Sequence, residues 1–206
     1  MRRLAIALAA LLALPVALAS GAGQPRTGGE LLSLVDGASA TSQVRYRVDD
    51  AGWGRFLLVR TVVTGRFLVR AHFADDEQLW FAGVGRTITV MCTKDGGRSS
   101  AADCLKIDGR RQRAAQGALA SIETVLLPSV LRVAFGDALE QAPLTRQTVL
   151  GLPVSCLHVR TLTTCVDAAG LVLRSGIGRG TRARALSVTA RVGTADLALP
   201  APAHAG

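Results

Sequence analysis

The stretch GLPVSCLHVRTLTTCVDAAGLVLR, residues 151–174, decides the fold of this chain. It predicts a β-hairpin with Arg160 and Thr161 as a two-residue loop, followed by a third strand. In that register Cys156 lies directly opposite Cys165 at a non-hydrogen-bonded position, where Cα atoms approach within disulfide range. Alternation places Leu157, Val159, Leu162 and Val166 on one face, and Cys156, His158, Thr163 and Cys165 on the other. Because Arg-Thr is a poor pair for a primed turn, a four-residue loop of the same parity remains an alternative. The alternative to the disulfide is a pair of buried free thiols.

The N-terminal segment predicts where such a disulfide would form. Two arginines precede an apolar run at residues 4–14 and a small-x-small site at residues 17–19. This order is typical of a secretory signal peptide, cleaved near Ala19. A retained transmembrane anchor is the alternative, but Pro15 breaks the run, which is shorter than the roughly 20 residues that a spanning helix needs. Because the first cysteine is Cys92, we expect an exported protein without a lipid anchor, in the cell envelope or outside the cell.

Composition limits the classes of partner. The formal charge is +9, carried mostly by arginine, since Lys94 and Lys106 are the only lysines and asparagine is absent. Such a bias is typical of a GC-rich bacterial genome, so a solvated basic face is the simpler interpretation. Contact with a membrane surface or with cell-wall polymers stays open. We expect no nucleic acid, because the chain has only eight aromatic residues and no recognisable binding motif.

The periodicity predicts one domain. Residues 20–42 are expected to form a linker and a short helix from Glu30 to Ser42, residues 43–202 the domain, and residues 203–206 a tail, with the whole of LPAPAHAG frayed. Strands are predicted at residues 43–48, 55–64, 66–73, 78–82, 87–92 and 145–150, then in the hairpin, at 170–177 and at 182–192. In the last strand Leu186, Val188, Ala190 and Val192 are predicted to face inward.

The other two cysteines enclose a short polar loop, TKDGGRSSAAD. Four cysteines allow three pairings. We favour Cys92 with Cys104 and Cys156 with Cys165, because each pairing is local and the second has cross-strand parity. Zinc is the competing interpretation, but no C-x-x-C occurs, and export argues against structural zinc. No cofactor or metal is expected.

The period becomes helical in the middle of the chain. From Arg111 to Leu127 apolar residues recur at three and four positions, and Pro128 must end the helix. A second helix is predicted from Ser129 to about Gln141. The resulting class is α+β: about nine strands in a strongly curved antiparallel sheet, an incomplete β-barrel, covered by two or three helices inserted between the strand blocks. A groove is expected between helices and sheet.

The exported architecture, a Cys pair before the helices, and G-x-P-x-x-C followed by C-V-D-x-x-G-L-V-L-R resemble the actinobacterial relatives of the lipoprotein-localisation factor LolA, a superfamily that includes the mycobacterial lipoproteins LppX and LprG. The matching residues are Gly151, Pro153, Cys156, Cys165, Val166, Asp167, Gly170 and Leu171 to Arg174. The resemblance implies an incomplete β-barrel with an apolar cavity for acyl chains. This sequence departs from the mycobacterial lipoproteins by lacking their lipidation cysteine.

Catalytic motifs are absent from the sequence. There is no G-x-S-x-G, H-E-x-x-H, P-loop or C-x-x-C. Residues 176–180, GIGRG, are interpreted as a turn between strands, His72 and His158 as surface histidines, and Asp167 as a turn residue. We therefore expect no enzyme.

The sequence leads to a hydrophobic-ligand hypothesis: a monomer that binds a lipid or acyl chain between sheet and helices, as in lipid or lipoprotein carriage. The lining residues predicted by facing are Phe67, Val69, Phe73, Trp80, Leu126, Leu131 and Phe135. The alternative is a ligand-free interaction or sensor module that contacts an envelope protein.

Overall fold

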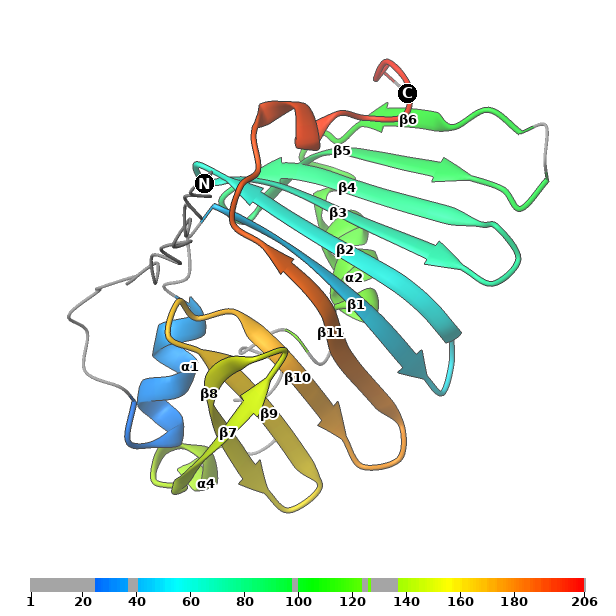
Figure 1. Ribbon diagram of the computed structural model, residues 1–206. Coiled ribbons are helices and arrows are strands. Elements are labelled where there is room, and N and C mark those ends of the chain that lie inside the picture. Colours follow the sequence, from blue (N-terminus) through cyan, green and yellow to red (C-terminus); the bar gives the residue numbers. More distant parts are fainter. Residues whose placement is uncertain (1–24, 37–40, 98–99, 124–125, 127–136, 206) are drawn as a thin grey trace, which may run out of the picture.

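One antiparallel sheet dominates the computed structural model, which describes residues 25–36, 41–97, 100–123, 126 and 137–205 (Figure 1). Its strands are β1 (Ser42–Asp50), β2 (Gly54–Val63), β3 (Arg66–Phe73), β4 (Gln78–Val84), β5 (Thr87–Lys94), β6 (Asp103–Lys106), β7 (Leu144–Val149), β8 (Leu152–Val159), β9 (Leu162–Asp167), β10 (Val172–Ile177) and β11 (Thr181–Thr189). The helices are α1 (Gly28–Asp36), α2 (Gln112–Ile122) and α4 (Asp137–Glu140), with a 3-10 turn, η2 (Thr194–Leu197). The predicted signal peptide and most of the predicted second helix lie outside the described residues.

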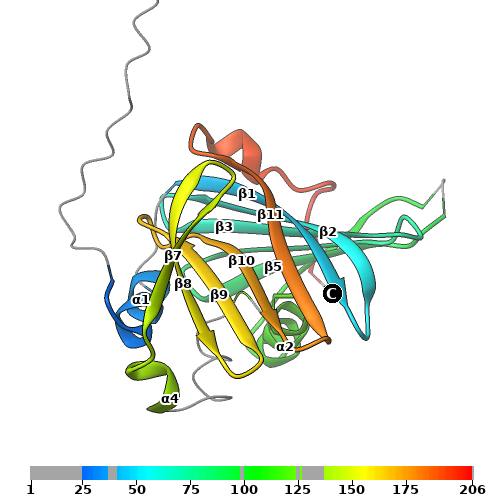
Figure 2. The ribbon, with the colours of Figure 1, turned by 60° about the horizontal axis from the view of Figure 1, so that its bottom comes forward.

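The strand order is β6-β5-β4-β3-β2-β1-β11-β10-β9-β8-β7, so β6 and β7 are the terminal strands and the sheet is not closed. Two meanders, β1 to β6 and β7 to β11, meet where β1 pairs with β11. The sheet is strongly curved and twisted (Figure 2). These observations confirm the predicted curved antiparallel sheet. They correct the strand count, because the four-residue β6 was too short to recognise from its pattern.

The inner face of the sheet forms the main core. Val44, Tyr46 and Val48 alternate along β1 and are at most 3% exposed, as their period of two predicts. They join Phe56, Leu58, Val69 and Phe81 from the neighbouring strands. Helix α2 packs near β5, and α1 packs against α4 and β8. The helices therefore cover this face, with Ala115 and Ile122 of α2 and Leu31 and Leu32 of α1 buried.

A β-bulge corrects the predicted facing of β11. Tyr46 is opposite Ala185 while Arg45 is opposite Ser187, so Leu186 is an extra residue in the ladder. Leu186 is 44% exposed, whereas Ala185 is 1% exposed. The strand also ends at Thr189, so Ala190 and Val192, predicted to face inward, lie beyond it.

The C-terminal tail is docked, not frayed as predicted. His204 accepts a backbone hydrogen bond from Lys106 and donates one to Cys104, at 2.9 and 3.0 Å. Leu197, Leu199, Ala201 and Ala203 pack on a small outer cluster formed by Leu68, Trp80, Cys92 and Cys104. The tail therefore covers part of the outer face beside β6.

No helix in the described ranges is both long and apolar enough to cross a membrane.

Candidate functional site

Both predicted disulfides are present. Cys92 is bonded to Cys104 across β5 and β6, and Cys156 to Cys165 across β8 and β9, each with Cα atoms 4.0 Å apart. The β8–β9 register is the predicted one, with Arg160 and Thr161 between Val159 and Leu162. Arg160 adopts a positive φ of 52°, as a primed two-residue turn requires. Two disulfides fit a protein exported to an oxidising compartment.

The predicted lining residues divide between the two faces of the sheet. Val69 is 1% exposed and Phe73 and Leu126 are 8% exposed in the main core, with Phe67 packed against it. Trp80 lies on the outer face with Leu68, so its predicted inward facing was wrong. The reason is that β4, QLWFAGV, is apolar at positions of both parities. Leu131 and Phe135 lie outside the described residues.

An ion pair that the sequence analysis missed lies on the inner face. Arg60 of β2 stands opposite Val44 and Val69, both buried, and its Nε is 3.4 Å from Oε1 of Glu123 at the end of α2. The Glu123 side chain is 5% exposed and that of Arg60 39%. Oε1 of Glu123 has no hydrogen-bond partner. An arginine at an inner position of the otherwise apolar segment LLVRTVV was the signal that could have revealed the pair.

Burial controls the electrostatics of this inner site. It raises the pKa of Glu123, and the Arg60 guanidinium opposes that rise. Burial also raises the pKa of Tyr46, whose hydroxyl donates a hydrogen bond of 2.8 Å to the Val172 carbonyl. The ion pair between the buried Glu123 and the partly exposed Arg60 links the end of α2 to the sheet.

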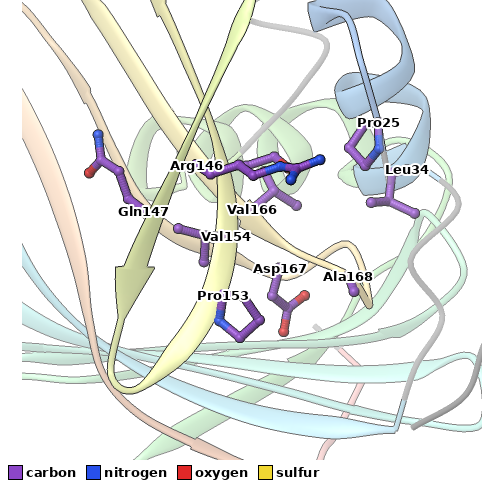
Figure 3. Close-up of a pocket in the computed structure, with 10 residues that line it drawn as sticks. Pro25, Leu34, Arg146, Gln147, Pro153, Val154, Val166, Asp167 and Ala168 are labelled. Atoms are coloured by element: carbon purple, nitrogen blue, oxygen red, sulfur yellow. The ribbon is translucent and has the colours of Figure 1, made fainter. Parts of the chain in front are cut away.

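A small hollow separates α1 from strands β7 to β9 (Figure 3). It has a volume of about 70 Å³ and is lined by Leu34, Pro153, Val154 and Val166 among others. Asp167 lies at its side, where its carboxylate accepts hydrogen bonds from the backbone of Ala169 and Leu171 at 2.9 and 2.8 Å. This confirms the predicted turn role, and burial raises the pKa of Asp167. The hollow is small beside typical ligand pockets of about 300 to 1,000 Å³.

Two larger hollows lie on the outer face. One, of about 370 Å³, runs between the C-terminal turn η2 and β1 to β4, and Arg70 there stacks over the Trp80 ring at 5.5 Å. The other, of about 600 Å³, lies between the β7–β8 turn and the outer face of β1, β11 and β10. We call this second hollow the arginine cleft, because Arg47, Arg174, Arg182 and Arg184 line it with a single acid, Asp49. The sequence analysis proposed no such site.

The histidines lie apart from one another. His72 is 3.3 Å from Asp76, His158 contacts Gln147 and Thr163, and His204 is 2.7 Å from Asp103. Within the described part of the chain no three His, Cys, Asp or Glu residues gather as a metal site would require. The predicted turn between β10 and β11 is formed by residues 178–180, while Gly176 and Ile177, which were also assigned to it, still pair in the β10–β11 ladder. That the chain is not an enzyme stays a prediction.

No protein-family model matches the sequence, and no curated protein matches it. Among solved structures the fold is similar to the crystal structure of MucB, with a TM-score of 0.49 and 14% identity over 80% of this chain and 59% of that one. It is also similar to the MucA/MucB complex of Pseudomonas aeruginosa, with a TM-score of 0.47 and 14% identity over 81% of this chain and 61% of that one. The chain thus spans about three fifths of the length of these two structures. A likeness of this strength assigns no function, so the resemblance to LolA relatives stays a prediction.

Proposed function

We propose that this chain is a non-catalytic binding module of the cell envelope that recognises its partner through the outer face of its sheet. One observation carries the proposal. The hollow between α1 and the strands measures about 70 Å³, whereas the hollows on the outer face measure about 370 and 600 Å³. The described inner face is packed by its own side chains, including Leu58 and Phe81 at 0% exposure. A carrier of acyl chains would need an apolar cavity of several hundred Å³, several times the volume of the hollow beside α1.

A hydrophobic ligand on the inner face is the second candidate function. The observation in its favour is Arg60, whose side chain is 39% exposed and stands on the inner face beside Val44 and Val69. Such a cation could hold a carboxylate head while the acyl chain replaces side-chain contacts in the core. The predicted incomplete barrel with a lipid cavity belongs to this candidate.

Native mass spectrometry of protein purified without detergent, followed by organic extraction, separates the two candidates. The surface module predicts protein without lipid and no uptake of a fluorescent fatty acid. The carrier predicts a stoichiometric lipid, and a fatty-acid affinity that falls in Arg60→Gln but not in Arg45→Gln, an exposed outer-face arginine on the adjacent strand. Stoichiometric lipid together with that difference would overturn the proposed surface module.

A further inference from the structure

Three arginines form a row across the outer face. Arg47 of β1 is directly opposite Arg184 of β11, and Arg184 is directly opposite Arg174 of β10. Neighbouring strands lie about 4.8 Å apart, so the three side chains leave the same face side by side. Like charges directly opposite one another destabilise a sheet. The row therefore places positive charge in the arginine cleft at a cost to the fold.

The charge in the cleft is poorly compensated. Asp49, the one acid that lines it, is 2.7 Å from Nε of Arg55, outside the cleft, and 4.0 Å from Nε of Arg47. Among the residues that the structure describes, no carboxylate comes within ion-pair distance of Arg174, Arg182 or Arg184. All three are exposed. A cleft lined by one sign of charge concentrates counter-ions of the other sign.

The opposite wall is a hairpin turn that exposes leucine. Thr148, Val149 and Leu150 line the cleft, and β7 runs at a steep angle to β9 and β10 (Figure 1). Leu150 has a φ of +54°, a conformation in which turns favour glycine or asparagine. It is 45% exposed, and Leu152 is 36% exposed. Leu150, which lines the cleft, and Leu152, which follows it in the same turn, thus present apolar surface to solvent beside a cationic cleft.

We propose that the arginine cleft binds the phosphate of an anionic membrane lipid, with Leu150 and Leu152 entering the interface beside it. A planar guanidinium binds phosphate oxygens through two hydrogen bonds, and neighbouring arginines can share one phosphate. A soluble phosphate would use the arginines alone, whereas a lipid surface also uses exposed apolar side chains. The inference rests on the proposed function, because it names the partner of the same outer face.

Vesicle sedimentation tests the proposal on the full mature chain. The protein should bind phosphatidylglycerol–phosphatidylcholine vesicles and not pure phosphatidylcholine vesicles. In Arg174→Gln/Arg184→Gln the partition should fall about 25-fold, since each basic residue near an anionic surface contributes about fivefold. The matched control is Arg110→Gln/Arg113→Gln, which removes equal charge from exposed positions outside the cleft. Thermal melting verifies that all variants fold.

The turn variant Leu150→Asn/Leu152→Gln distinguishes a lipid from a soluble anion. Vesicle binding should fall several-fold, while calorimetric binding of inorganic pyrophosphate should not change. Three results would overturn the proposal: equal losses in the cleft and control variants, pyrophosphate binding without vesicle binding, or binding of polyglutamate as tight as that of the anionic vesicles. A lipid found inside the purified protein would contradict the proposed function but not the cleft, so the two can fail separately.

Discussion

The two faces of the sheet are built from the same strands but covered differently. Along β1 the side chains of Val44, Tyr46 and Val48 enter the core, while Arg45 and Arg47 between them face outward. Helices cover the inner face, whereas among the described residues the outer face is covered by the C-terminal tail, from β2 to β6, and by the β7–β8 turn beside the arginine cleft. This difference indicates that the inner face determines the stability of the sheet, while the outer face is available for recognition. Inner-face substitutions should unfold it, and outer-face substitutions should act locally.

The largest expected effect is on the inner face. Arg60→Met leaves the buried Glu123 carboxylate without its cation and should lower the free energy of unfolding by about 3 kcal/mol or more. Glu123→Gln should instead be tolerated, because the neutral amide removes a carboxylate whose pKa burial already raises. Urea denaturation of both variants and of the double variant measures the coupling. Equal stability of wild type and Arg60→Met would contradict the view that the pair holds α2.

Removal of either disulfide should have the next largest effect. The loss of unfolding free energy should be similar for the two bonds, but the region that loses protection should differ. Their sequence separations of 12 and 9 residues predict about 3 kcal/mol each in the chain-entropy model. Cys92→Ala/Cys104→Ala should lose amide-exchange protection in β5, β6 and the tail, because this bond lies in the small outer cluster. Cys156→Ala/Cys165→Ala should lose it throughout the second meander, because this bond touches the main core. Identical exchange patterns would erase the distinction between the two regions, and unchanged melting under oxidising conditions would reject the role of either bond.

Removal of residues 197–206 should have a smaller effect. Leu197 and Leu199 are partly buried on Trp80, so we expect a loss of about 2 kcal/mol. In a Trp53→Phe background the fluorescence of Trp80, 6% exposed in the intact protein, should shift to longer wavelength. The matched control removes only residues 205–206, beyond the last packed alanine. An unshifted spectrum after the longer deletion would show that the tail does not cover this ring.

The smallest effect is the pH dependence of the tail. Hydrogen bonding to the Ala205 carbonyl, and then to Asp103, raises the pKa of His204. The contact is therefore fully stabilising below the ordinary histidine pKa of about 6.5 and is lost as the pH rises through the higher folded value. Carboxypeptidase should accordingly release the tail faster above that range than below it. His204→Gln should remove this pH dependence, and a pH-dependent rate in that variant would assign it to another group.

Local alternation was enough to predict most of the strands, the stapled hairpin and the turn at Asp167. Each depends on residues close in sequence, whose facing follows from a period of two. The facing of Trp80 did not follow, because β4 is apolar on both sides and only tertiary packing selects the face. The bulge at Leu186 is equally invisible, since it arises from pairing with a strand about 140 residues earlier.

The surface features that the sequence analysis did not predict have only weak signals in the sequence. Leu197, Leu199, Ala201 and Ala203 alternate, which would have indicated a tail that packs along one side, but proline and alanine suggested fraying. The arginine cleft could not be predicted, because its residues come from separate strands that become neighbours only through the strand order.

The single seam between β1 and β11 has a consequence for how the chain folds. Every other strand pair joins consecutive strands, so nearly all pairings are short in sequence, while Asp49 must find Arg182. Low contact order within each meander favours rapid local formation, and closure of one long loop then limits the rate. The seam is also the natural place of division. Two fragments cut between β6 and β7 would keep every other strand ladder intact. They should reassociate through the β1–β11 ladder, together with the contacts of the tail on β6 and of α1 on β8, and restore the complete sheet by complementation.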